Sequence, residues 1–225
     1  MNKKEIEELF YIKKEYSKIK ELLINSEESW SFNILGKINL EEANYNNAYS
    51  FFLKANNLSG CGYCKFLEGK IEEAKEILIL LKDSSPFVNW ILFLIDLCTS
   101  IKDIYPTYFQ IRNFYEQDLE MLFIAKQYEI IKKILNKNYF LEKFNREIYK
   151  YSARVLKNNT YEKEAEILLK KSLDICYKDP ETHYMLGEIY LNQDKKEEAI
   201  KEFKKANEVN QGYNPANDRL KDLCN

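Results

Sequence analysis

Apolar side chains recur every three or four residues along almost the whole chain, which is the spacing of an amphipathic α-helix. Near the start, Ile6, Leu9 and Phe10 begin such a stripe. No alternating run of the kind that strands show interrupts the pattern. The pattern therefore predicts an all-α protein, with further helices over 30–40, 45–58, 61–68, 70–81, 86–101, 106–125, 128–138, 141–157, 161–176, 181–191, 196–209 and 215–224.

The breaks between the predicted helices are short and carry residues that end or begin helices. Gly69 separates two of them, and Ser85-Pro86 and Asn214-Pro215 each combine an N-cap residue with a first-turn proline. The chain has only 6 glycines and 4 prolines among 225 residues, which argues against a turn-rich sandwich or barrel. Helix pairs joined by tight turns are the expected arrangement, and they call for a repeat search.

The C-terminal region contains a periodic motif. It is carried by His183, Leu186, Gly187, Tyr190, Ala199, Phe203 and Ala206. Steps of 34 residues towards the N-terminus keep its register, first at Tyr149, Ala153, Leu156, Ala165, Leu169 and Ser172, then more weakly at Tyr115, Leu119, Leu122, Ile131, Leu135 and Asn138. In the N-terminal half the same pattern occurs at Phe32, Leu35, Gly36, Ala48, Phe52 and Ala55, and a shortened copy follows at Gly62, Gly69, Ala74, Leu78 and Pro86.

These spacings resemble the tetratricopeptide repeat, with His183 where tryptophan is most usual. The resemblance implies a right-handed α-solenoid of antiparallel helix pairs. Small residues such as Gly187 would let paired helices approach, and large ones such as Phe203 would fill the space between pairs. We expect one solenoid over 1–225: a diverged helix pair at 1–28, repeats at 29–86, an irregular helical insertion at 87–111, three repeats at 112–213 and a capping helix at 214–225.

Composition and charge exclude several functions. One histidine rules out sites that need two imidazoles, and neither phosphate-binding glycine motif is present. The formal net charge of −2 gives no reason to expect electrostatic capture of nucleic acid. An odd number of cysteines without an N-terminal signal sequence favours a reducing, cytoplasmic location. We predict no enzyme activity, no cofactor, no metal and no membrane association.

Two residue patterns that suggest chemistry have simpler interpretations. His183 is the sole candidate for an imidazole base, but its repeat position predicts a half-buried packing residue that tyrosine or tryptophan would replace without loss of stability. Cys61 and Cys64 have the spacing of a redox motif. No strand precedes them, so we expect two small apolar side chains on a short helix.

The sharper functional feature is a basic stripe. Lys150, Arg154 and Lys157 share one helix face. In tetratricopeptide-repeat proteins this face lines a concave groove, so the resemblance implies a peptide-binding site, with an acidic segment held by Arg154 as the expected ligand. Further candidate groove residues are Tyr184, Glu188, Leu191 and Asn192. Alternatively, Glu116, Glu120 and Glu188 on neighbouring helices neutralise the stripe. The lysine–asparagine clamp of co-chaperones is not matched, because Arg154 and Met185 stand where asparagine is needed.

The resemblance therefore implies a non-enzymatic scaffold that binds a protein or peptide segment. A second hypothesis is self-association through the aromatic segment 87–115, which contains Trp90, Phe93, Tyr105, Tyr108, Phe109 and Phe114. The same aromatic residues could instead form extra core. RNA binding through a helical repeat is a weaker third hypothesis.

Overall fold

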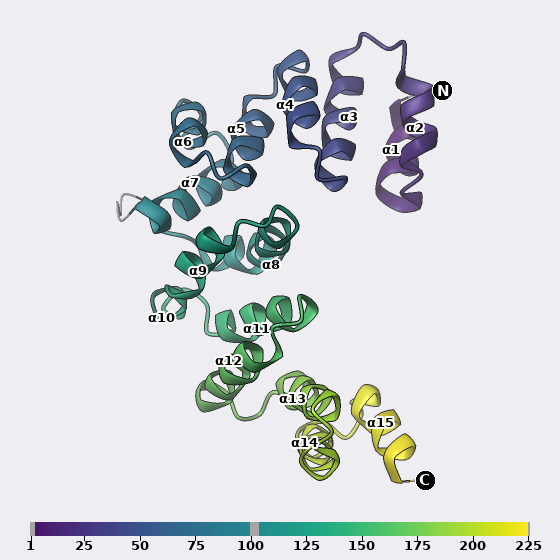
Figure 1. The fold of residues 1–225 in the computed structure, drawn as a ribbon, viewed down its shortest axis with the longest axis vertical. Helices are drawn as coiled ribbons and strands as arrows, with labels where there is room; N and C mark the ends of the chain where they lie inside the picture. Colours follow the sequence, from purple (N-terminus) through teal and green to yellow (C-terminus); the bar gives the residue numbers. More distant parts are fainter. Residues whose placement is uncertain (1–2, 100–103, 225) are drawn as a thin grey trace. The chain divides into compact units, whose positions relative to one another are not determined.

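The computed structural model describes residues 3–99 and 104–224. Within these ranges every regular element is a helix, which confirms the all-α prediction (Figure 1). The first half contains α1 (Lys3–Glu8), the π-helical η1 (Leu9–Lys13), α2 (Tyr16–Leu23), α3 (Ser29–Glu41), α4 (Tyr45–Lys54), α5 (Leu58–Leu67), α6 (Ile71–Ile79) and α7 (Pro86–Thr99). The second half contains α8 (Tyr108–Ile124), α9 (Tyr128–Leu135), α10 (Asn138–Leu141), α11 (Ile148–Asn158), α12 (Glu162–Ile175), α13 (Pro180–Asn192), α14 (Lys196–Val209) and α15 (Asn214–Cys224).

The chain forms two compact units. Unit 1 comprises residues 1–106 and 121–134, and unit 2 comprises residues 107–120 and 135–225. The long helix α8 therefore contributes its first part to unit 2 and its end to unit 1. Parts of three sequence-based segments lie outside the described residues: positions 1–2 of 1–28, 100–103 of 87–111, and the last position of 214–225.

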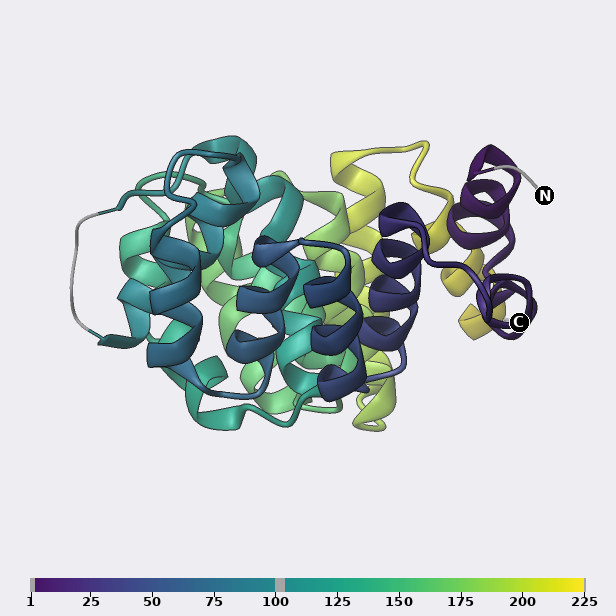
Figure 2. The same ribbon diagram turned by 90° about the horizontal axis from the view of Figure 1, so that it is seen from above.

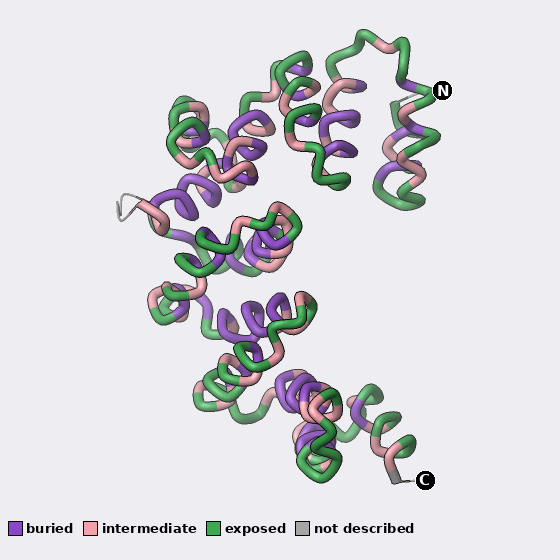
Figure 3. The backbone as a smooth tube through the Cα atoms, in the orientation of Figure 1, coloured by how far each residue is buried: buried purple, intermediate pink, exposed green. Residues whose placement is uncertain are grey.

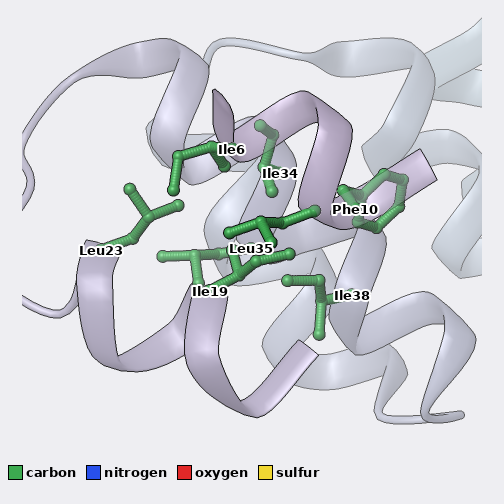
Figure 4. Close-up of a cluster of buried hydrophobic side chains, with 8 residues drawn as sticks. Ile6, Phe10, Ile19, Leu23, Ile34, Leu35 and Ile38 are labelled. Carbon is green, nitrogen blue, oxygen red and sulfur yellow. The ribbon is translucent and has the colours of Figure 1, made fainter. Parts of the chain in front are cut away.

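In unit 1, consecutive helices pack against one another in chain order. Helices α3 to α6 each contact the next helix along the chain, and Figures 1 and 2 both show α3 and α4 side by side. At the N-terminal end, Ile6, Phe10 and Ile19 from α1, η1 and α2 meet Leu35 and Ile38 of α3 in one buried cluster (Figure 4). The apolar stripe predicted from the first residues is thus buried against α3.

Helix α7 is buried over most of its length, as Figure 3 shows. Trp90 and Phe93 are 0% and 2% exposed, so they are core residues and not an exposed surface for self-association. This agrees with the extra-core interpretation of these two side chains. The exposed aromatic side chains come later in the chain: Tyr105, Tyr108 and Phe109 are 59%, 43% and 68% exposed.

In unit 2, α11 to α15 also pack in chain order, and α11 additionally contacts α13, the first helix of the following pair. Helix α15 lies against α14, where Ala216 and Leu220 join the cluster around Phe203. On the other side of α15, Lys221 and Asp222 are exposed. A helix with an apolar inner side and a polar outer side is suited to end a stack of helix pairs, so we propose that α15 is a capping helix.

The turn inside each helix pair has a recurring backbone geometry. Lys126, Thr160 and Asp194, spaced 34 residues apart, have φ angles of 58°, 70° and 60°. In each case the N–H of the next residue bonds to a carbonyl five residues before it, as in Tyr161 N–H to Leu156 O at 2.8 Å. This is the helix C-terminal turn that contains one left-handed residue. From Lys126 onwards this turn returns every 34 residues, whereas in the first half of the chain the same turn occurs at Ala43, Asn56 and Gly69, 13 residues apart.

The paired helices approach closely where the motif has glycine. A Cβ atom placed on Gly187 of α13 would lie 2.5 Å from Cε1 of Phe203 on α14. Ordinary contacts of a Cβ atom are 3.4–4 Å, so a larger residue does not fit without movement of the ring. The expectation that Gly187 permits close packing against a large aromatic side chain is therefore confirmed.

The helix predicted over 141–157 is wrong in its first part. Helix α10 ends at Leu141 and α11 begins at Ile148, with a loop of residues 142–147 between them. The side-chain oxygen of Asn145 accepts the backbone N–H of Glu147 at 2.9 Å. Asparagine competes in this way with helical hydrogen bonds, which favours a turn where the apolar spacing alone predicts a continuous helix.

Candidate functional site

The candidate groove residues all lie in unit 2, on α11 and α13. Lys150, Arg154 and Lys157 lie on α11, whose other side is buried through Ala153 and Leu156. The 3.6-residue period places the three basic residues on one side of the helix. Their surroundings decide whether their charges are available to a ligand.

Lys150 is enclosed by carboxylates. Its residue is 7% exposed, and its Nζ lies 2.8 Å from Glu147, 3.0 Å from Asp179 and 3.5 Å from Glu181. Burial lowers the pKa of the ammonium, but the hydrogen bonds to Glu147 and Asp179 outweigh it and raise the pKa. The charge of Lys150 is thus balanced inside the protein, and this lysine positions the start of α13 against α11.

Arg154 bridges two helices. One guanidinium nitrogen donates to Glu116 of α8 and the other donates to Glu181 of α13 at 2.6 Å. Burial lowers the pKa of Arg154, and the two carboxylates more than offset this effect. Burial raises the pKa of Glu116, with Arg154 acting in the opposite direction. The Arg154 side chain remains 29% exposed, so it is more accessible than Lys150.

The charges around this pair are mainly negative. The two cations face four carboxylates, those of Glu116, Glu147, Asp179 and Glu181. The sequence-based alternative, neutralisation by neighbouring helices, correctly named Glu116. It missed Asp179 and Glu181, although the repeat register offered a signal, because Glu147 and Glu181 are 34 residues apart and hold equivalent positions.

The other two carboxylates named in that alternative have different partners. Glu120 accepts hydrogen bonds from the side chains of Asn158 and Asn159, at 3.1 and 2.7 Å. Glu188 accepts two hydrogen bonds from Arg219 of α15, at 2.8 and 3.0 Å. These contacts tie α8 to α11 and α13 to α15, so they hold the first helices of successive pairs and the final helix together.

Lys157 is the basic residue of the stripe that keeps an available charge. It is half-buried, and no carboxylate lies within 4.0 Å of its ammonium in the part of the chain that the structure describes. It lies one turn beyond Arg154 on α11. Of the three, Lys157 is therefore the cation best placed to meet an added negative charge.

The candidates on α13 share one side of that helix, because their positions are spaced by three or four residues, but their contacts differ. The ring of Tyr184 packs against Phe203 and Tyr213, with centroids 5.7 and 5.8 Å apart, and Leu191 joins the same cluster. Asn192 instead donates to Glu162 of α12 at 2.6 Å. With Glu188 bound to Arg219, all four residues already have partners inside unit 2, and their place in a groove stays a prediction.

The sole histidine is buried and fully hydrogen-bonded. His183 is 0% exposed, with Nδ1 2.7 Å from Glu202 Oε2 and Nε2 3.0 Å from the carbonyl oxygen of Tyr177. It packs between helices as its repeat position predicts, but it is not half-buried, and its role is polar as well as steric. With both ring nitrogens occupied and no exposure, the imidazole has no free nitrogen for a substrate.

The cysteine pair is also inert in this structure. Cys61 and Cys64 are free thiols, 1% and 0% exposed, on α5. Burial raises the pKa of Cys64 to about 12 and also raises that of Cys61. A thiol that stays protonated is a poor nucleophile and a poor metal ligand. The prediction of two small buried side chains is confirmed.

Among residues 3–99 and 104–224, no group of histidine, cysteine, aspartate and glutamate side chains is arranged to hold a metal ion. No helix in the same ranges is long and apolar enough to cross a membrane. The residues with unusual surroundings in unit 2 are therefore those of the ion-pair network on α8, α11 and α13.

Comparison with known proteins agrees with the repeat predicted at residues 180–213. A family model described as "Tetratricopeptide repeat" matches residues 180–213, which contain α13 and α14. A search of curated proteins finds no significant match. Proteins with this repeat generally serve as non-enzymatic scaffolds for protein binding, and the match indicates no catalytic family.

Three solved structures resemble the chain at low identity. YrrB, a TPR protein with an unusual peptide-binding site, is 15% identical, with a TM-score of 0.39, over 92% of this chain and 98% of that one. TTC0263, a thermophilic TPR protein from Thermus thermophilus, is 18% identical, with a TM-score of 0.36, over 87% and 98%. A tetratricopeptide repeat protein from Parabacteroides merdae ATCC 43184 is 16% identical, with a TM-score of 0.38, over 93% and 91%. Likeness at this level carries no argument about function. The family match therefore identifies one tetratricopeptide repeat, at residues 180–213.

Proposed function

We propose that this protein is a non-enzymatic scaffold that binds a protein or peptide segment along the first-helix face of unit 2. We define this face by the residues at which the unit 2 part of α8 meets α11 and α13: Glu116, Arg154, Lys157 and Glu181. The repeat supports a binding role, since stacked helix pairs offer an extended surface made of many side chains. No partner is implied by the fold itself.

The observation that carries the proposal is the double ion pair of Arg154. Its two carboxylate partners are themselves accessible, with side chains 34% exposed for Glu116 and 39% for Glu181. If a ligand carboxylate takes the place of Glu181, the released glutamate keeps Lys150 as a partner at 3.5 Å, so no buried charge is left unpaired. Arg154 can therefore exchange partners at small cost, whereas the enclosed Lys150 cannot.

We propose that the bound segment carries acidic residues. The planar guanidinium of Arg154 suits a carboxylate held by two parallel hydrogen bonds, and Lys157 adds a positive charge one turn away. The surrounding carboxylates oppose this binding, and they limit it to segments that place their negative charge at Arg154 and Lys157. Such binding should weaken as salt rises, because the charges involved are partly exposed.

A peptide selection tests this function. A random peptide library is selected on the immobilised full-length protein, and enriched peptides are measured by fluorescence polarisation on wild type, Lys157→Gln and Arg154→Gln. Lys163→Gln is the matched control, since Lys163 is a lysine on α12, outside the first-helix face. We expect Lys157→Gln to weaken binding several-fold and Lys163→Gln to leave it unchanged. Equal affinity for all four proteins, or selection of basic peptides only, would refute the proposal.

We also propose a reducing cytoplasmic location. The sequence has an odd number of cysteines, and burial on α5 raises the pKa values of the Cys61 and Cys64 thiols, as expected for structural cysteines of a reducing compartment. Fractionation of the native cells with an antibody against the protein tests this location. Recovery from an extracellular or periplasmic fraction would contradict it.

A further inference from the structure

A second surface of unit 2 has the features of a binding pocket. It lies where the loop of residues 142–147, between α10 and α11, meets Tyr108 at the start of α8, and we call it the loop pocket. Its cavity volume is about 680 Å³, within the range of ligand-binding clefts, and it is open to solvent. Its walls contain both aromatic and charged side chains, so it differs from the ion-paired first-helix face.

The two cations of the loop pocket have no carboxylate partner among the described residues. Neither Lys143 nor Arg146 is buried, and no carboxylate lies within 4.0 Å of either one in the described ranges of the chain. The nearby Glu147 already accepts from Lys150 at 2.8 Å and from the hydroxyl of Tyr151 at 2.7 Å. The hydrogen bond from Lys150 is the main reason that the pKa of Glu147 is lowered.

After Glu147 is assigned to Lys150, the charges left on the loop pocket are two cations against the one carboxylate of Glu142. This is the reverse of the surroundings of Lys150 and Arg154, where four carboxylates face two cations. An incoming negative charge at Arg146 needs no existing ion pair to break. The loop pocket therefore offers a carboxylate a less costly site than Arg154 does.

The aromatic side chains of the loop pocket determine which group a ligand must carry next to its negative charge. Tyr108 and Tyr139 line the loop pocket and are 43% and 61% exposed, with Phe144 between the charged residues of the loop. Phe109, 68% exposed, extends the apolar area, and its ring contacts that of Tyr108 with centroids 5.6 Å apart. Exposed aromatic side chains beside arginine are typical of the centres of protein-binding surfaces. A ligand that carries an apolar side chain next to its negative charge would cover these exposed rings.

Asn145 also lies in the wall of the loop pocket. It is 2% exposed, its side-chain oxygen accepts the N–H of Glu147, and its Nδ2 lies near the Tyr151 hydroxyl, an interaction that acts to lower the pKa of Tyr151, without a hydrogen bond of ordinary geometry. Buried donors are nearly always satisfied in folded proteins.

We infer that the loop pocket, with Arg146, Lys143, Tyr108 and Tyr139 in its walls, binds an acidic peptide segment in which a carboxylate is next to an aromatic residue. Arg146 and Lys143 hold the carboxylate, and the tyrosine rings pack on the aromatic side chain. This goes beyond the proposed function, because the loop pocket shares none of the residues that define the first-helix face. A nucleic acid strand fits less well, since Glu142 and Glu147 line the same cavity and the chain carries a net charge of −2.

The test uses fluorescence polarisation with the full-length protein. The probe is a short fluorescein-labelled peptide in which aspartate and phenylalanine alternate. The comparison probes replace aspartate by asparagine, replace phenylalanine by serine, or consist of oligouridine. We expect the first probe to bind most tightly, and each replacement to weaken binding about tenfold, as loss of a charge-assisted hydrogen bond or of an aromatic anchor does. Tighter binding of oligouridine would overturn the assignment.

Matched variants locate the site. Arg146→Gln and Lys143→Gln should each weaken binding of the aspartate–phenylalanine peptide about tenfold, with Lys163→Gln on α12 as the control. Tyr139→Ala should do the same, with Tyr128→Ala, 51% exposed in unit 1, as its control. Equal effects of variants and controls would overturn the inference. Loss of binding in Lys157→Gln but not in Arg146→Gln would also overturn it while supporting the first-helix face, so the two proposals fail separately.

Discussion

Substitution of alanine for Gly187 probes the packing on which the repeat depends. The added Cβ would lie 2.5 Å from Cε1, 2.7 Å from Cδ1 and 2.8 Å from Cζ of Phe203, so the whole edge of the ring must move. Phe203 is 0% exposed and shares its buried cluster with Ala199 and Ala206, which leaves it little room. Overpacking of this kind costs about 1–3 kcal/mol.

The net effect is smaller than the packing cost, because alanine is the better helix former. Replacing glycine inside a helix returns about 1 kcal/mol. We therefore expect Gly187→Ala to destabilise unit 2 by up to about 2 kcal/mol, which lowers Tm by roughly 2–4 °C per kcal/mol in a protein of this size. Both tryptophans, Trp30 and Trp90, lie in unit 1, so unfolding in urea should be followed by circular dichroism and not by tryptophan fluorescence.

Two further variants make this result specific. At Gly212 an added Cβ would have its nearest neighbour at 3.5 Å, an ordinary contact, so Gly212→Ala should change stability by less than about 0.5 kcal/mol. Phe203→Leu removes the ring edge, so Gly187→Ala should cost about 1 kcal/mol less in that background than in wild type. A Gly187→Ala protein more stable than wild type, or additive effects of the two substitutions, would refute the close approach of α13 and α14.

Four other substitutions or conditions have predictable effects. His183→Trp introduces the residue most usual at this repeat position. It should nevertheless lower the unfolding free energy by about 1–3 kcal/mol, because Glu202 and a backbone carbonyl lose their hydrogen bonds to the imidazole. Thermal unfolding that matches wild type would contradict this. Tyr115→Phe should cost a similar amount in urea unfolding, since the buried hydroxyl bonds to two side chains at 3.0 and 2.8 Å. Thr160→Gly should raise the Tm by an amount that corresponds to about 1 kcal/mol of unfolding free energy, because a β-branched residue at a φ of 70° is strained. A lower Tm would disprove the strain. Stability should fall in acid: burial opposes ionisation of Asp179 and Glu202, but their hydrogen bonds outweigh it and lower both pKa values. Their contribution is present above the ordinary carboxyl pKa and is lost as pH drops through the lowered values, so a urea midpoint independent of pH in acid would contradict it.

The helix pairs could be predicted from the sequence because local spacing determines them. The distance between Gly187 and Phe203 along the chain places both at the crossing of two helices, whatever the neighbouring repeats do. His183 shows the limit of this reasoning. Its burial follows from its repeat position, but its hydrogen bond to Glu202 depends on a side chain of the partner helix that no motif specifies.

The network around Arg154 could be predicted only in part. Glu116 lies 38 residues before Arg154, close to the 34-residue repeat spacing, so the repeat register places the two near each other. Glu181 lies at the start of α13, and its contact with Arg154 depends on how the two helices cross. The loop pocket was missed because the apolar spacing favours one helix across residues 141–157. The hydrogen bond of Asn145 to the backbone of Glu147 favours the turn that replaces the start of that helix, and a single side-chain contact of this kind has no periodic signature.

The central claim is that the first-helix face of unit 2 binds a peptide segment, and hydrogen exchange tests it most directly. The wild-type protein is measured with and without a peptide obtained by library selection. The account predicts added protection concentrated in α11 and at the start of α13, around Arg154 and Glu181, and its loss in Lys157→Gln. Protection confined to α3–α6, or no change in α11 at saturating peptide, would contradict it.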